Sequence, residues 1–117
     1  MVSWPLQILG AASLFAIGCA AQMQYTPTST QGEPKFYNCP FAVLTTRPPR
    51  PFEELGIIDF TGGHFFDGRR TGVPENANEF KSKAAQYVCH SGGDAVLADV
   101  NGMGQYIRGT VIRYKPE

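Results

Sequence analysis

Three cysteines and two histidines are the residues of this chain best suited to chemistry. Two of each type fall after residue 35, and a Cys2His2 set is compatible with zinc. These four are Cys39, His64, Cys89 and His90. Zinc signatures space paired ligands by a few residues, whereas the adjacent Cys89 and His90 would diverge by about 100° on a helix. The spacing leaves three alternatives open for the two cysteines: a disulfide, two free thiols or a metal site.

The third cysteine, Cys19, lies near the end of an apolar run. Trp4 to Ala21 is apolar and ends in small residues, as a secretory signal does, and no charged residue precedes Glu33. Near the end of this run, residues 16–19 read Ala-Ile-Gly-Cys and resemble a bacterial lipobox. In a lipobox the cysteine becomes the acylated N-terminus of the mature protein. More than one acyl chain holds a protein durably on a bilayer. We therefore expect a signal peptide at residues 1–18 and lipid attachment at Cys19.

Lipid attachment predicts a place in the bacterial cell envelope. Ala20 rather than Asp follows the cysteine. By resemblance to lipoprotein sorting rules, this favours the outer membrane, with the domain facing the periplasm. The alternatives are ordinary cleavage near Ala21, which would give a soluble periplasmic or secreted protein, and an uncleaved anchor. In an oxidising compartment two leftover thiols usually pair, which favours a disulfide between Cys39 and Cys89.

Residues 19–35 have the composition of a flexible tether. The stretch from Gln22 to Pro34 is polar and poor in branched apolar residues. Such a segment cannot bury enough surface to offset the entropy of ordering it. The alternative is that it lies along the domain in a polyproline-like path. A single domain is then expected over residues 36–117. Ten basic and ten acidic residues give the chain a net charge of zero, which provides no field to hold nucleic acid.

The expected element order is β-β-α-β-β. Strands are predicted at 36–46, 52–60, 94–100 and 105–115, and a helix at 77–91. Asn76 is the expected N-cap of the helix, with Glu79 three residues later as in a capping box. Gly92 and Gly93 are expected to end it. The pattern predicts an α+β fold, with one helix packed on a small, mainly antiparallel sheet.

A long glycine-rich loop, or a hairpin extension, is expected at residues 61–74. It combines the aromatic pair Phe65 and Phe66 with the cationic pair Arg69 and Arg70. Long loops often carry function, and Phe and Arg are favoured at protein interfaces. We expect these four residues to contact a protein partner. In the alternative interpretation, the two phenylalanines fold back on the core and the two arginines are merely solvated.

The C-terminal half resembles a known family. The motifs are Leu-Gly at 55–56, Ala-Ala at 84–85, Gly-Asp-Ala-Val at 93–96 and Tyr-x-Arg at 106–108. They are similar to the pattern of the small envelope lipoproteins around the stress sensor RcsF and the YbjQ-like group, over residues 52–114. The resemblance implies an α+β fold and a sensor or assembly role in the envelope. RcsF-type sensors carry two domain disulfides, whereas residues 94–116 hold no cysteine here.

The sequence predicts a function in binding rather than in catalysis. It shows no carboxylate pair in a plausible geometry, no triad, no phosphate loop and no cofactor fingerprint. The predicted function is that of a non-catalytic envelope lipoprotein, tethered to the bilayer by an acylated Cys19, that binds another envelope protein. We expect no cofactor. The alternative function is a periplasmic module that binds a small ligand or a metal.

Overall fold

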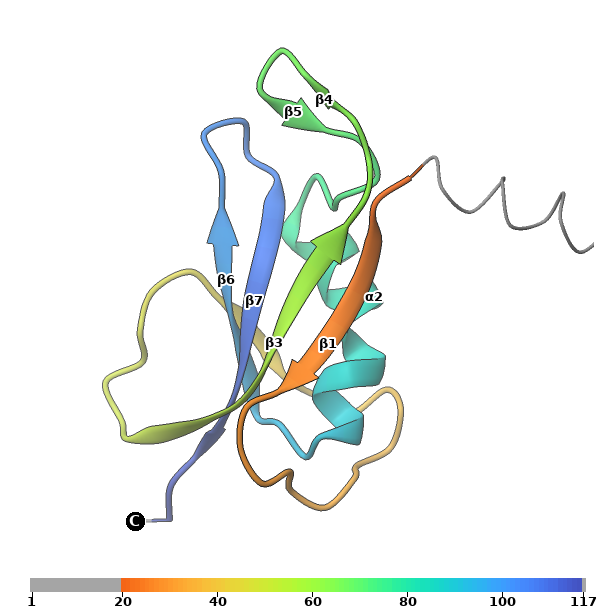
Figure 1. Cartoon of the computed structure of the whole chain (residues 1–117). Helices are drawn as coiled ribbons and strands as arrows, with labels where there is room; N and C mark the ends of the chain where they lie inside the picture. Colours follow the sequence, from red (N-terminus) through yellow and green to blue (C-terminus); the bar gives the residue numbers. More distant parts are fainter. Residues whose placement is uncertain (1–19, 117) are drawn as a thin grey trace, which may run out of the picture.

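The computed structural model describes residues 20–116, in which a five-stranded sheet is covered on one face by helix α2 (Ala77–His90) (Figure 1). The strands lie in the order β1-β3-β7-β6-β2. Their bounds are Gln22–Pro27 for β1, Ala42–Leu44 for β2, Phe52–Thr61 for β3, Ala95–Val100 for β6 and Tyr106–Tyr114 for β7. A separate hairpin consists of β4 (Phe65–Phe66) and β5 (Arg69–Arg70). The predicted α+β class, with one helix on a mainly antiparallel sheet, is confirmed.

Helix α2 begins and ends where its sequence predicts. The side chain of Asn76 accepts a hydrogen bond of 2.8 Å from the backbone N–H of Glu79. The Glu79 carboxylate reaches one residue further back than in a standard capping box and accepts from the N–H of Glu75. At the other end Gly92 has a φ of +79°, which lets the chain reverse after Ser91.

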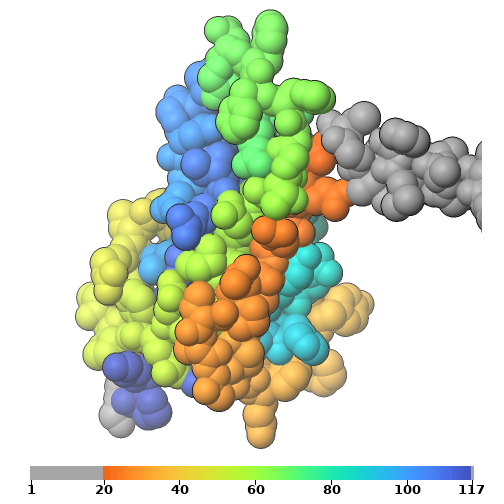
Figure 2. Space-filling model, in the orientation of Figure 1, coloured from red at the N-terminus to blue at the C-terminus, as the bar shows by residue number. Residues whose placement is uncertain are grey.

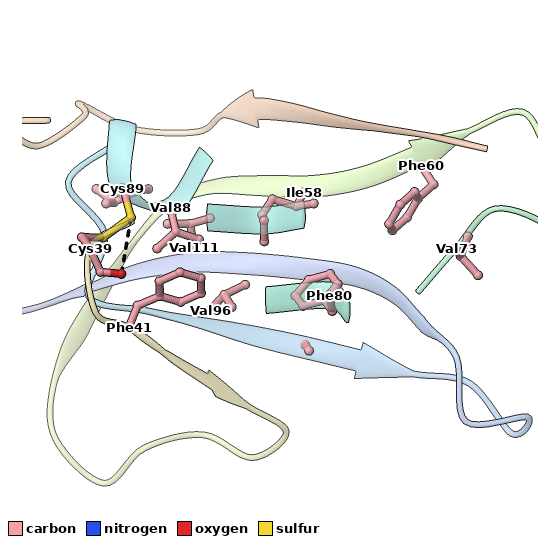
Figure 3. Close-up of a cluster of buried hydrophobic side chains, with 13 residues drawn as sticks. Cys39, Phe41, Ile58, Phe60, Val73, Phe80, Val88, Cys89, Val96 and Val111 are labelled. Carbon is pink, nitrogen blue, oxygen red and sulfur yellow. Dashed lines mark hydrogen bonds between the residues drawn. A yellow bond between two sulfur atoms is a disulfide. The ribbon is translucent and has the colours of Figure 1, made fainter. Parts of the chain in front are cut away.

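The hydrophobic core lies between the helix and the sheet (Figure 3). The helix buries Phe80, Ala84, Val88 and Cys89. Leu55, Ile58, Val96 and Val111 of the sheet are also buried. A Cβ added to Gly109 of β7 would lie 2.8 Å from both Phe80 and Val96. Glycine at this position therefore allows the helix to pack closely on the centre of the sheet.

The tether predicted for residues 19–35 is wrong from residue 22 onward. Gln22–Pro27 is strand β1, which pairs antiparallel with β3 along its whole length. The ring of Tyr25 occupies the space that a side chain at Gly56 would need, since a Cβ added there would lie 2.3 Å from the ring. Backbone pairing and a few ring contacts stabilise a segment that its composition alone would leave disordered. The domain thus starts at β1 rather than at residue 36, whereas the predicted signal peptide and Cys19 lie outside the described residues.

The strand predicted at 36–46 is much shorter than expected. Only Ala42–Leu44 forms a strand, β2, and it pairs parallel with β6 at the edge of the sheet. The residues before it pass the C-terminal end of α2, where Cys39 forms the disulfide with Cys89 that the sequence favoured. The backbone N–H of Gly32 donates to Ser91 and that of Lys35 donates to Cys89. Residues 28–41, hereafter the disulfide-end loop, are therefore fixed to the helix end by several bonds.

Candidate functional site

The predicted loop at 61–74 contains a tight hairpin, whose residues 64–71 form one end of the molecule, hereafter the hairpin end. Its turn residues Asp67 and Gly68 both have positive φ angles, of 54° and 83°, as a two-residue hairpin turn requires. Phe65 and Phe66 are 76% and 78% exposed. The interpretation in which these two rings fold back on the core is therefore wrong.

The two arginines of the hairpin are not merely solvated either. The Arg70 guanidinium donates to the carbonyl of Phe60 at 3.0 Å and to that of Gly62 at 2.9 Å. It also lies 5.4 Å from the centroid of the Phe65 ring. Arg69 forms an ion pair with Glu75. Arg70 thus has a structural role, which leaves the two phenylalanines as the side chains most available to a partner.

A buried glutamine, which sequence reasoning missed, fixes the hairpin to the sheet. The side-chain oxygen of Gln105 accepts from the Arg70 N–H at 2.9 Å, and its amide donates to the Arg70 carbonyl at 2.8 Å. The same amide donates to Glu75, and the oxygen also accepts from Asn101. Gln105 is completely buried, and these bonds satisfy its amide. Its position at the start of the predicted last strand was the one available signal.

A second exposed aromatic pair lies at the opposite end of the sheet. Phe36 and Tyr37 of the disulfide-end loop are 86% and 81% exposed. Beside them is a hollow of about 420 Å³, lined by Tyr25, Lys35, Tyr37, Gln86, Tyr87 and His90. Phe36, Tyr37 and the residues that line this hollow are hereafter called the disulfide end. The sequence did not single it out, because Phe36 and Tyr37 were expected inside a strand.

Two of the tyrosine rings that line the hollow contact each other. Tyr25 and Tyr87 stack with their centroids 5.9 Å apart. The Tyr25 hydroxyl donates to the Gln31 side chain at 2.6 Å, and the Tyr87 hydroxyl donates to the Met23 carbonyl. Burial raises the pKa of Tyr25 above its ordinary value of 10.0. A tyrosine hydroxyl is neutral at physiological pH even at its ordinary pKa, and the upward shift makes its ionisation harder still.

Lys35, at the rim of the hollow, is already paired. Its ammonium donates to Asp94 at 2.8 Å and to the Gly93 carbonyl at 2.9 Å. Partial burial alone would raise the pKa of Asp94. The hydrogen bonds from Lys35 and from the Tyr114 N–H outweigh this, together with the positive charge of Lys35, and hold that pKa below 3.8. The pair anchors the disulfide-end loop to the start of β6.

The structure separates the residues of the proposed metal set. His64 lies on the hairpin, whereas His90 ends helix α2 at the opposite end of the molecule (Figure 1). Cys39 and Cys89 are bonded to each other. Within residues 20–116 no three His, Cys, Asp or Glu side chains are grouped as metal ligands would be. The described side chains therefore do not assemble the Cys2His2 site that the sequence left open.

Comparison of the chain with protein-family models, with curated proteins and with solved structures found no match. Of the described residues, none belongs to a helix that is both long enough and apolar enough to cross a bilayer. Among the described residues, the two exposed aromatic pairs are the surface features best suited to binding.

Proposed function

We propose that this chain is a non-catalytic lipoprotein of the bacterial envelope that binds another envelope protein through its disulfide end. The observation that carries the proposal is the adjacent pair Phe36 and Tyr37, each more than 80% exposed, beside a hollow with tyrosines in its lining. Aromatic side chains supply much of the binding energy at protein interfaces.

The way in which this aromatic pair is held supports a binding role. The disulfide Cys39–Cys89 lies two residues beyond Tyr37, and the Lys35 N–H bonds to the helix end just before Phe36. A segment fixed on both sides loses little conformational entropy when a partner binds. The backbone that carries the exposed rings is therefore fixed before any contact is made.

The proposed location follows from the N-terminal sequence. The apolar run up to Ala21 and the lipobox-like exit support acylation of Cys19 and export, and Ala20 supports the outer membrane with the domain facing the periplasm. The disulfide is consistent with an oxidising compartment. The intact mass of protein from native membranes tests the anchor: we expect an N-terminus at Cys19 with added acyl mass, whereas a mass fitting cleavage near Ala21 would reject it.

A second candidate function has one observation in its favour. The hollow of about 420 Å³ is of the size that small ligands occupy, and it combines tyrosine rings with the polar side chains of Gln86 and His90. A small-ligand module of the periplasm would use this same surface. Cross-linking distinguishes the two functions, because a small ligand would not appear as a cross-linked protein.

The partner proposal is tested by cross-linking in native membranes followed by purification of the chain. We expect a cross-linked envelope protein with the parent chain and its loss in the double variant Phe36→Ser, Tyr37→Ser. A second variant, Phe65→Ser, Phe66→Ser, changes an equally exposed aromatic pair at the other end and reports whether the contact lies there instead.

Each pattern of loss has a separate meaning. Loss in the disulfide-end variant alone supports the proposal. Loss in the hairpin variant alone would move the contact to Phe65 and Phe66, as the sequence predicts. A parent chain that captures no protein would reject a protein partner, and binding studies at the hollow would then follow.

A further inference from the structure

Ala20 and Ala21, the residues just before strand β1, lie at the base of the β4–β5 hairpin. The Ala20 carbonyl lies 3.3 Å from where a Cβ on Gly62 would be, and the Ala21 nitrogen lies 2.6 Å from where one on Gly72 would be. Gly62 and Gly72 flank the β4–β5 hairpin on its two sides. Figures 1 and 2 show the hairpin projecting from the same end of the molecule as the start of β1.

There is almost no free chain between the proposed lipid and the domain. Strand β1 begins at Gln22, three residues after Cys19, and three extended residues span at most about 10 Å. Because Ala20 and Ala21 already lie against the hairpin base, acyl chains on Cys19 would place the hairpin end at the bilayer surface. The disulfide end, at the far end of β1, would then face away from the membrane.

The hairpin end has the apolar side chains that such a position would use. Phe65 and Phe66 are exposed, and Met103 of the β6–β7 turn is 43% exposed. Met103 lies beside the hairpin turn, since its Cγ is 3.7 Å from where a Cβ on Gly68 would be. The tip of the hairpin and the neighbouring turn thus present three large apolar side chains at the end where the chain joins the domain.

We propose that Phe65 and Phe66 insert into the headgroup region of the bilayer to which Cys19 is attached. This inference depends on the lipid anchor of the proposed function. The anchor holds the hairpin at a high effective concentration beside the lipid, so a contact that is weak in free solution becomes populated. Insertion fixes the orientation of the domain and directs Phe36 and Tyr37 toward the periplasm.

The polar residues of the hairpin set the depth of this insertion. Asp67 is exposed at the turn, and Arg69 is paired with Glu75. Their charges remain hydrated if the rings reach the headgroup and acyl boundary but not the hydrocarbon centre. Arg70 is bonded to the carbonyls of Phe60 and Gly62, so its guanidinium already has partners when the hairpin meets lipid.

A tryptophan reporter tests the proposal. The single tryptophan of the sequence, Trp4, lies in the signal peptide, so a mature chain from Cys19 has none. Phe66→Trp places a reporter in the hairpin, and Phe36→Trp places a control at the disulfide end. The acylated variants are purified from native membranes and reconstituted in phosphatidylethanolamine and phosphatidylglycerol vesicles, with and without brominated phosphatidylcholine. A thermal melt checks that each variant folds, and Phe65→Trp replaces Phe66→Trp if it does not.

The expected result is an asymmetry between the two reporters. Bromolipid should quench the hairpin tryptophan about twofold, because a ring buried roughly 5–10 Å into the headgroup and acyl boundary lies beside the brominated chains. The Phe36→Trp reporter should be quenched far less. Equal quenching of both reporters, or of neither, would overturn the proposal.

Two further outcomes separate this inference from the functions on which it depends. If neither variant floats with the vesicles, the lipid anchor is wrong and the insertion fails with it. If both variants float and the emission maximum of the hairpin tryptophan moves to shorter wavelength only in native membranes, the hairpin binds a membrane protein rather than lipid. That result would overturn the insertion and leave the anchor standing.

Discussion

The two ends of the sheet expose similar aromatic pairs but hold them by different means. Phe65 and Phe66 are carried by a hairpin that hydrogen bonds attach to the sheet, between Arg70 and Gln105 and from the Arg70 guanidinium to the carbonyls of Phe60 and Gly62. Phe36 and Tyr37 are carried by a loop that a disulfide joins to helix α2. The first attachment can open locally, whereas the second cannot open without breaking a covalent bond. The difference matches an adaptable surface beside the proposed bilayer and a rigid one facing the proposed protein partner.

The largest expected effect comes from removing the covalent attachment. The double variant Cys39→Ala, Cys89→Ala should lower the free energy of unfolding by about 4 kcal/mol at most, the loop-closure value for a 50-residue separation. Urea unfolding of the mature chain measures the loss. The amide hydrogens of the disulfide-end loop should then exchange faster through local opening. The hairpin amides should exchange faster only as far as the whole domain unfolds more often.

Reduction of the parent chain is the matched control, because it breaks the same bond without changing a side chain. Both treatments should give the same loss. A loss below about 1 kcal/mol would contradict the comparison, since the backbone bonds of Gly32 and Lys35 would then be holding the loop without help from the disulfide.

How far the sequence predicts this difference depends on the kind of interaction involved. The disulfide was predictable, because the expected export would leave Cys39 and Cys89 as two thiols in an oxidising compartment. The helix was predictable from local capping at Asn76 and Gly92. Strands β3, β6 and β7 follow their hydrophobic patterns to within two residues of the expected bounds.

The parts that were missed depend on partners far away in the chain. Strand β1 has only a short alternation, Met23 and Tyr25 between polar residues, and it is ordered by pairing with β3, 29 to 39 residues later. The role of Gln105 depends on Arg70, 35 residues before it. The exposure of Phe36 and Tyr37 follows from Cys39 bonding the helix end, which bends this segment out of the strand that its composition indicates.

A smaller effect is expected from weakening the hairpin attachment. Gln105→Leu keeps the buried volume but leaves the N–H and the carbonyl of Arg70 without their partners. Unsatisfied buried groups cost roughly 1–3 kcal/mol each, and the hairpin can escape that cost by opening to water. Exchange of the Arg70 amide hydrogen should therefore accelerate about tenfold or more, whereas the disulfide-end loop should not change.

Gly102→Ala is the matched control for this change. It lies in the neighbouring β6–β7 turn, and an added Cβ there would meet nothing within 4 Å. We expect it to leave hairpin exchange unaltered. If Gln105→Leu instead accelerated exchange across the whole chain by one common factor, the hairpin would be part of the core unit and the two ends would not differ in the way described.

The smallest expected effect is a pH dependence at the disulfide end. The pKa of Asp94 lies below 3.8 in the folded chain and returns to its ordinary value on unfolding. The unfolded chain therefore binds more protons in this range, and stability rises with pH. The contribution of Asp94 is complete above its ordinary pKa and is lost as the pH falls through the lower, folded value. Because the pair with Lys35 is about one-third exposed, we expect it to contribute less than about 1 kcal/mol.

Urea unfolding of the parent chain and of Asp94→Asn, between about pH 6 and about pH 3, measures this contribution. The two curves should differ at the upper end of the range and converge at the lower end. Lys35→Met should remove only part of the difference, because the Tyr114 N–H still donates to the Asp94 carboxylate. If Lys35→Met removed all of it, the ion pair alone would lower the pKa, and the bond that joins Asp94 to the end of β7 would contribute nothing to holding this end of the sheet.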